Sequence, residues 1–334
     1  MQTEFENTFT SKPEPSFNQI ARPRLAFFPK ILMFASRREL LLTLYRWMTR
    51  ARRAQLTRSF ESDCAFPACI LFYHRVSNQT INDWSIRAKN FERQMYWIKQ
   101  NATPSSLDEI RLSQLKGSRS KAMVGVTFDD GYGENCEFAI PILVEHKIPV
   151  TYFVSTHYVE TGEPFPHDIA NGKVLRPNTI AEVKRMAADG VEIGAHSHTH
   201  LDFGKPLGKK QLKIEINDVR KKLQDWTGQS IDYFAFPYGL KANITQGAID
   251  AVFEAGHKSF VCAAGGFNLP GGKANHLVRC HGEPGFAAFM NWLTFDPRKV
   301  FGNSPINFQN HEPQMPTLPQ RTLVVPESSH AVLN

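Results

Sequence analysis

The sequence predicts an α/β fold, built either as a parallel sheet or as a (β/α) barrel, with a basic helical arm at its N-terminus. Short apolar strands alternate with amphipathic helices at least five times between residues 69 and 261. Chains with this alternation form parallel sheets or barrels. At 334 residues and 42% hydrophobic content, the chain is long enough for one large domain or two modest ones.

The basic charge of the chain is confined to its N-terminal part. Residues 1–60 contain eleven Lys and Arg against four Asp and Glu, whereas the rest of the chain contains 28 of each kind. The main body therefore needs no anionic partner such as nucleic acid. Residues 1–24 are polar and contain prolines, which predicts a tail without fixed structure.

The early sequence shows no membrane span and no secretory signal. The first apolar run covers residues 25–35, contains Pro29 and Lys30, and is far shorter than the roughly 20 residues of a membrane helix. Because 24 mostly polar residues precede that run, it does not resemble a signal peptide. We therefore expect a cytoplasmic protein, with peripheral attachment to the inner membrane as an alternative.

Residues 36–58 predict a basic amphipathic helix within an N-terminal arm that covers residues 1–65. Ser36 and Glu39 have the spacing of a capping box. Apolar side chains follow at helical spacing, namely Leu41, Leu44, Met48 and Ala51. Such a helix could lie on an anionic membrane surface. The alternative, which we favour, packs the helix on the domain and leaves its basic side in water.

The main body is expected to cover residues 66–302. Short apolar runs predict strands at residues 70–73, 123–128, 150–154, 191–195, 233–236 and 259–261. Amphipathic stretches predict helices at residues 91–100, 135–146, 179–189, 209–226 and 244–255. From about residue 303 the chain is rich in Pro, Asn and Gln, which predicts a flexible C-terminal tail over residues 303–334.

Polar residues cluster where successive strands are expected to end. They are His74, Asp129, Asp130, His196, His198, His200 and the run Pro237-Tyr238-Gly239. In barrels and in open parallel sheets, the carboxyl ends of the strands carry the active site. The sequence therefore predicts that these side chains meet at one site.

Two of these motifs suit a metal ion. His196 and His200 are four residues apart and can converge on one ion, while His198 would point elsewhere. With Asp130 they would form a site of two histidines and one carboxylate, which suits zinc or another divalent ion. A nearby cation would also relieve the repulsion between Asp129 and Asp130. Taken alone, the Asp-Asp-Gly motif is equally well explained as a polar turn.

Three motifs resemble those of a known family. The segments Thr127-Phe128-Asp129-Asp130-Gly131, His196-Ser197-His198-Thr199-His200 and Phe234-Ala235-Phe236-Pro237-Tyr238-Gly239 are similar, in order and spacing, to the first three motifs of the polysaccharide deacetylase family. This family is also called the NodB-homology family or carbohydrate esterase family 4. Residues 71–76 and 91–95 also resemble the start of many bacterial members. The resemblance covers about residues 69–300.

The resemblance implies a distorted (β/α) barrel of the NodB-homology type and a metal-dependent hydrolase. Such an enzyme removes N-acetyl groups from an N-acetylhexosamine-containing glycan or glycoconjugate. It implies Asp130, His196 and His200 as ligands of a divalent metal, zinc first, with cobalt, nickel or manganese as alternatives. It implies Asp129 as the base for attack by metal-bound water, and the backbone N–H of Tyr238 as a donor to the oxyanion.

The sequence departs from the family pattern in two places. The arginine often found in the third motif is Ala235 here, and Arg279 is a candidate to replace it by holding Asp129. The fifth motif, usually Leu-x-His, appears only loosely in residues 277–281. His281 is our candidate for the acid that protonates the departing amine, and His74 is its rival.

Two other functions remain open at this point. Relatives of this family hydrolyse non-sugar C–N bonds, so the amide could belong to another kind of molecule. The chain could also be a catalytically inactive carbohydrate-binding homologue, but such a protein has no need of the base Asp129. The deacetylase is the leading hypothesis, with either a polymer or a small precursor as substrate.

Overall fold

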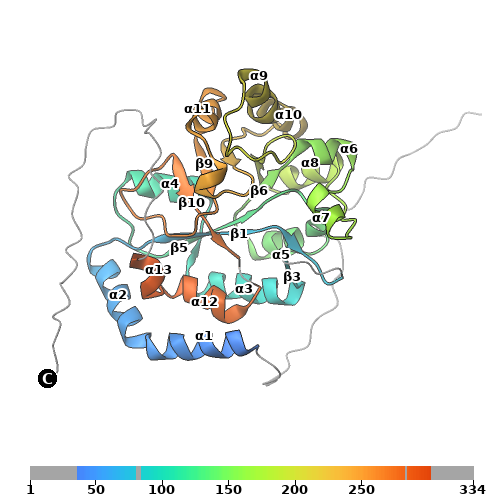
Figure 1. Cartoon of the computed structure of the whole chain (residues 1–334). Coiled ribbons are helices and arrows are strands. Elements are labelled where there is room, and N and C mark those ends of the chain that lie inside the picture. The colour runs from blue at the N-terminus through green and yellow to red at the C-terminus, as the bar shows by residue number, and fades with distance from the viewer. Residues whose placement is uncertain (1–35, 80–83, 283, 302–334) are drawn as a thin grey trace, which may run out of the picture.

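The computed structural model describes residues 36–79, 84–282 and 284–301, and its main feature is a parallel sheet that curls into a nearly closed barrel (Figure 1). The strands lie in the order β10-β9-β8-β7-β6-β5-β1-β11, and β4 pairs with β5. Their bounds are β1 (Ala68–Tyr73), β4 (Thr103–Pro104), β5 (Met123–Phe128), β6 (Val150–Val154), β7 (Glu192–Ala195), β8 (Tyr233–Ala235), β9 (Ser259–Cys262), β10 (His276–Val278) and β11 (Cys280–His281). A separate pair is formed by β2 (Arg75–Val76) and β3 (Ser85–Ile86). The predicted tails, residues 1–24 and 303–334, lie outside the described residues.

The chain itself brings the two edges of the sheet together. The edge strands β10 and β11 pair with β9 and β1 respectively, and only Arg279 separates them in the sequence. Adjacent Cα atoms are only about 3.8 Å apart, so the two edges must meet at Arg279. The predicted barrel is thereby confirmed.

Alternate residues of the strands point into the barrel. An interior cluster contains Ala68, Ile70, Phe153, Tyr233, Ala235, Val261 and Leu277, whereas the intervening strand residues belong to the main core. This two-residue period of strands continues just past the strand ends. The next inward positions belong to His74, Asp129, His196 and Arg279. The pleat of the strands therefore directs these four side chains to one site.

Helices surround the barrel. They are α3 (Ala88–Asn101), α4 (Leu107–Leu115), α5 (Ala139–His146), α6 (Thr156–Thr161), α7 (Pro166–Ala170), α8 (Ile180–Ala188), α11 (Gln246–Glu254), α12 (Phe286–Leu293) and α13 (Pro297–Phe301). Single 3₁₀ turns form η2 (Gly133–Cys136) and η4 (Lys241–Asn243). The predicted strands and most predicted helices are present, but the sequence analysis missed α4, α6, α7, α12 and α13.

The helix predicted over residues 209–226 is present and contains a π-helical turn. It consists of α9 (Lys209–Leu212), the π-helical turn η3 (Lys213–Asn217) and α10 (Asp218–Thr227). A π-turn accommodates an extra residue within a helix and often lies at a functional site. Here the turn carries the buried Glu215.

The prediction of a single helix in the N-terminal arm is wrong. The arm contains two helices, α1 (Arg37–Met48) and α2 (Arg50–Ser62), which are separated at Thr49. The Thr49 hydroxyl donates to the Tyr45 carbonyl oxygen at 2.8 Å and accepts from Arg53 Nε at 2.9 Å. The buried Arg53 guanidinium in turn donates to Asn291 Oδ1 at 2.7 Å. These bonds fix α2 against the body of the protein at an angle to α1 (Figure 1).

The arm packs on the domain, but the apolar side of α1, which we expected to face the domain, faces solvent instead. The apolar side chains of α1 face solvent: Leu41, Leu44 and Met48 are 58%, 53% and 68% exposed. The polar side of α1 contacts α12 instead, where the Glu39 carboxylate accepts a hydrogen bond from the Ala287 N–H at 2.9 Å. Within the described ranges, no helix combines the length and apolar character that crossing a membrane requires.

Candidate active site and metal centre

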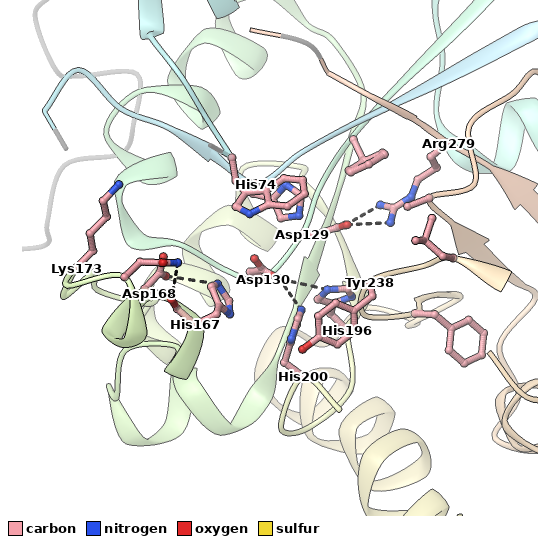
Figure 2. A pocket seen from close by; sticks show the side chains of 16 residues that line it. His74, Asp129, Asp130, His167, Asp168, Lys173, His196, His200, Tyr238 and Arg279 are labelled. Carbon is pink, nitrogen blue, oxygen red and sulfur yellow. Dashed lines mark hydrogen bonds and ion pairs between the residues drawn. The ribbon is translucent and has the colours of Figure 1, made fainter. Parts of the chain in front are cut away.

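A pocket of about 620 Å³ lies at the carboxyl ends of the strands (Figure 2). Its polar lining includes His74, Asp129, Asp130, His196, His200 and Arg279. Aromatic side chains, namely Phe72, Trp84, Phe236 and Tyr238, form much of the rest. The barrel thus brings into one cavity every residue that the sequence analysis placed at the site except His198, Pro237, Gly239 and His281.

Asp130, His196 and His200 form a compact group of potential metal ligands. Asp130 Oδ1 lies 3.3 Å from Nε2 of each histidine, and the three ligand atoms all lie within 4.8 Å of one another. Asp130 Oδ1 is buried and accepts no hydrogen bond from the described residues. An unsatisfied buried carboxylate beside two imidazoles fits a divalent cation such as zinc. The residues present therefore suit the metal that the family resemblance implies.

The ring of His196 is held by its other nitrogen. Nδ1 lies 2.8 Å from the Ala235 carbonyl oxygen, which can only accept, so we assign the proton to Nδ1. This tautomer leaves the lone pair of Nε2 directed toward Asp130. A backbone carbonyl that fixes the ring in this way is the usual support of a histidine ligand.

Burial and neighbouring charge have opposite effects on the pKa of Asp130. Burial alone would raise the pKa of this carboxyl group, but the imidazoles of His196 and His200 hold its pKa well below the usual value. Asp130 is therefore a carboxylate, the form that binds a cation.

The loops that carry the site adopt an unfavourable backbone conformation. Asp130, Ser197, His200 and Tyr238 have φ angles of 73°, 62°, 57° and 61°. Only seven non-glycine residues of the described ranges have positive φ, so more than half of them lie in the three motifs. Residues other than glycine adopt this region at an energetic cost and usually at functional sites. The loops must therefore be held in place by other contacts.

Glu215 provides such contacts, and the sequence analysis missed it. Its Oε2 accepts hydrogen bonds from the backbone N–H groups of His198 and Thr199 at 2.9 and 3.0 Å, and its Oε1 accepts from Thr199 Oγ1 at 2.7 Å. The available signal was a carboxylate on the apolar side of the predicted helix, between Leu212 and Val219. His198 itself points away from the metal ligands, as expected, and its Nδ1 hydrogen-bonds to a threonine hydroxyl.

Arg279 grips Asp129 with two parallel hydrogen bonds. Nη1 donates to Oδ1 at 2.6 Å and Nη2 donates to Oδ2 at 2.8 Å, and both side chains are buried. Burial would raise the pKa of Asp129, but the Arg279 guanidinium and His196 lower it below its usual value. The contact proposed from the sequence is thus present, and it favours the ionised form of Asp129.

The two candidate acids lie in different places. His74 lines the pocket above the two aspartates (Figure 2), and burial lowers its pKa to about 4 while Asp130 and Asp129 act in the opposite direction. His281 is not among the residues that line the pocket. It is half-buried on β11, with its ring centroid 6.3 Å from that of His74 and 5.6 Å from that of Trp84. The role of His281 as the acid stays a prediction.

Tyr238 borders the mouth of the pocket. Its side chain is 57% exposed, and its ring centroid lies 5.1 Å from that of His200. Among the described residues, no backbone carbonyl accepts a hydrogen bond from its N–H group. The expected role of this N–H group as a donor to the oxyanion stays a prediction.

One wall of the pocket was not expected from the sequence. It comes from α7 and the turn that follows, and it contributes His167, Asp168 and Lys173 (Figure 2). The buried Asp168 accepts a hydrogen bond from the Tyr132 hydroxyl at 2.7 Å. The sequence analysis had no helix at residues 166–170 and thus no reason to bring this segment to the site.

Comparisons with known proteins agree with this fold. The family model described as polysaccharide deacetylase matches residues 116–259, a range that contains all three motifs. A poly-β-1,6-N-acetyl-D-glucosamine N-deacetylase of Staphylococcus aureus is 30% identical over 196 residues, which are 52% of this chain and 65% of that protein. YxkH of Bacillus subtilis, assigned to the polysaccharide deacetylases, is 28% identical over 174 residues, which are 51% of this chain and 56% of that protein. The chain thus spans less than two thirds of the length of these relatives.

Solved structures share the fold. The Streptococcus pyogenes deacetylase PplD in complex with acetate matches with a TM-score of 0.59 and 19% identity, over 68% of this chain and 98% of that one. IcaB from Ammonifex degensii matches with a TM-score of 0.55 and 23% identity, over 69% of this chain and 97% of that one. The fold and the site therefore define an α/β barrel with a candidate metal centre at the carboxyl ends of its strands. Over residues 116–259 the chain is similar to the polysaccharide deacetylase family.

Proposed function

We propose that the protein is a hydrolase that removes N-acetyl groups from an N-acetylglucosamine-containing glycan. The observation that carries the proposal is the pairing of Asp129 with Arg279 beside the ligand group Asp130, His196 and His200. One carboxylate is thus free of metal ligation and ionised, next to a separate group that can bind a cation. Hydrolysis of an unreactive amide requires both a base and a group that polarises the carbonyl.

A divalent cation held by Asp130, His196 and His200 would polarise the amide carbonyl and make water a better nucleophile. Asp129 would accept the proton of the attacking water at a carboxylate oxygen. Arg279 keeps that carboxylate ionised and fixed in orientation. The Tyr238 N–H would donate to the carbonyl oxygen as negative charge develops on it.

The departing amine needs a proton. We assign its delivery to His74, because His74 lines the pocket beside both aspartates and His281 does not. The exposed rings of Trp84 and Tyr238 would pack against the apolar faces of sugar rings. The S. aureus relative is named for a β-1,6-linked N-acetylglucosamine polymer, so oligomers of that linkage are the first substrates to try.

The test is acetate release by the purified full chain from β-1,6-linked and β-1,4-linked N-acetylglucosamine oligomers. It is run with a chelator, with zinc or cobalt restored, and beside Asp129→Asn. Asp225→Asn, an exposed residue of α10, is the matched control. Acetate that disappears with the chelator, returns with metal and is lost only in Asp129→Asn supports the proposal. One-to-one metal binding without acetate release from either oligomer would show that the N-acetyl amide of these oligomers is not the substrate.

A further inference from the structure

Helix α1 carries an unusual concentration of exposed apolar side chains. Fifteen large apolar side chains are exposed in the described ranges, and five of them belong to this 12-residue helix. They are Leu40, Leu41, Leu44, Trp47 and Met48, with exposed fractions between 53% and 68%. Their helical spacing places them on one side, which we call the α1 outer face. Apolar patches of this kind usually mark an interaction surface.

The outer face is fixed in its outward orientation by bonds on the opposite side of the helix. The Glu39 carboxylate accepts from the Ala287 N–H in the first turn of α12, and the Tyr45 hydroxyl donates to Asp296 Oδ1 at 2.9 Å. Figure 1 shows α1 along the edge of the molecule, with α12 on its inner side. Turning the apolar side inward would break these bonds. The exposure is therefore a property of the docked helix.

The surroundings of the outer face are positively charged. The exposed arginines of this region are Arg37, Arg38, Arg50, Arg52 and Arg58. Glu39 is the only acidic residue between positions 36 and 60, and it is bound to α12. The Arg50 guanidinium lies 5.2 Å from the centroid of the Trp47 ring. Leucines and a tryptophan beside arginines, on a helix too short to span a bilayer, are typical of a helix that lies in a membrane interface.

We propose that the α1 outer face and its arginines dock the protein on an anionic phospholipid surface. The leucines, Trp47 and Met48 would enter the boundary between headgroups and acyl chains, and the arginines would contact lipid phosphates. A second copy of the chain is a poorer occupant, because a two-fold contact through α1 would bring the same arginines together. The proposal goes beyond the hydrolase chemistry and does not depend on it.

The test is binding of the full chain to lipid vesicles, measured by co-sedimentation. Vesicles of phosphatidylcholine with about 30% phosphatidylglycerol are compared with pure phosphatidylcholine, at low and high salt. The variant is Leu44→Glu/Trp47→Glu, which puts two negative charges on the outer face. The matched control is Tyr96→Glu on α3, because Tyr96 is 59% exposed and Trp47 is 60% exposed.

We expect the wild type to bind the anionic vesicles and to lose binding at high salt. The double variant should partition about tenfold or more weakly, and Tyr96→Glu should bind like the wild type. Thermal unfolding should be nearly unchanged in all three proteins, because the substituted side chains contact mostly solvent.

Absence of wild-type binding, or equal binding by the double variant, would overturn the proposal. Self-association without lipid that the double variant abolishes, seen by sedimentation velocity, would assign the face to a second copy and would also overturn it. Acetate release from soluble oligomers should be equal in all three proteins, since no α1 residue lines the pocket. Failure of the proposed hydrolase activity would leave the vesicle result intact, so the two proposals can fail separately.

Discussion

Arg279, at the point where the two edge strands of the barrel meet, binds Asp129, although the two residues lie 150 positions apart in the sequence. Asp129 follows β5, Arg279 connects the edge strands β10 and β11, and β1 lies between β5 and β11 in the sheet. One salt bridge therefore fixes the proposed base and ties the connection between the two edge strands to the end of β5. Its removal should affect both chemistry and stability.

We expect Arg279→Gln to lower kcat for acetate release by about 100-fold, because Asp129 loses its orientation. The free energy of unfolding should fall by about 3–5 kcal/mol, since a buried carboxylate is left without its partner. The double variant Asp129→Asn/Arg279→Gln should recover part of that stability, because no buried charge remains. Urea unfolding of the single and double variants measures this coupling. Additive losses would contradict a direct interaction.

Replacing the two candidate acids should separate their roles. His74→Gln should slow acetate release from an N-acetyl amide by about 100-fold. It should affect hydrolysis of 4-nitrophenyl acetate much less, because a phenolate leaves without being protonated. His281→Gln should change both rates only slightly. If His281→Gln instead gives the selective loss on the amide, the acid is His281, as the sequence analysis favoured.

The histidine motif offers an internal control for metal binding. His200→Gln should weaken zinc binding by at least about 100-fold, because it removes one of three ligands. His198→Gln, two positions earlier, should bind zinc like the wild type, since His198 faces Thr156 instead. Calorimetric titration of the metal-free protein measures both. Equal losses in the two variants would show that the motif binds metal in another arrangement.

Glu215 should act as a positioning residue for the metal site. Glu215→Ala removes the acceptor for three hydrogen bonds of the loop that carries His200, and we expect zinc affinity to fall about 10- to 100-fold. Glu215→Gln keeps one acceptor oxygen, so its zinc affinity should lie between those of the alanine variant and the wild type. Asp225→Asn, an exposed carboxylate of the adjoining helix α10, is the control. Calorimetric titration measures the zinc affinity of each variant, and thermal unfolding measures its stability. A merely structural role of Glu215 would lower the melting temperature without producing this order of zinc affinities.

Glu192, at the amino end of β7, should make stability depend on pH. Burial, with Asp232 and Asp108 nearby, raises the pKa of this carboxyl group to about 7, although the Thr151 hydroxyl donates to it. A folded pKa above the unfolded value of 4.5 means that the folded state holds its proton more tightly. The resulting stability is present below about pH 4.5 and is lost as the pH rises through about 7.

Glu192→Gln removes this dependence. Relative to the wild type, the variant should gain about 2–3 kcal/mol in the free energy of unfolding between pH 5 and pH 8. Urea unfolding at the two pH values measures the gain. The same difference between variant and wild type at both pH values would show that Glu192 ionises normally in the folded protein.

Local patterns in the sequence were sufficient for six of the barrel strands and for most of the site. Runs of buried apolar residues defined β5 and β6, and their alternation with helices predicted a parallel sheet. The chemistry of Asp130, His196 and His200 was visible because these residues lie directly after strands. Both predictions depend on the order of residue types within short segments, which a linear sequence records.

Three features were decided only by the tertiary structure. The strands β10 and β11 are too short for a periodic pattern, so the sequence offered Arg279 only as a candidate partner of Asp129. Glu215 lies in a π-turn of its helix, and its hydrogen bonds to the histidine loop join segments that no local pattern connects. The outward orientation of α1 depends on polar bonds to α12, a helix at the other end of the chain. The sequence by itself determined which elements form and which chemical groups are present, because short-range periodicity encodes them. The tertiary structure decided which groups meet, because that depends on the closure of the barrel and on contacts between distant segments.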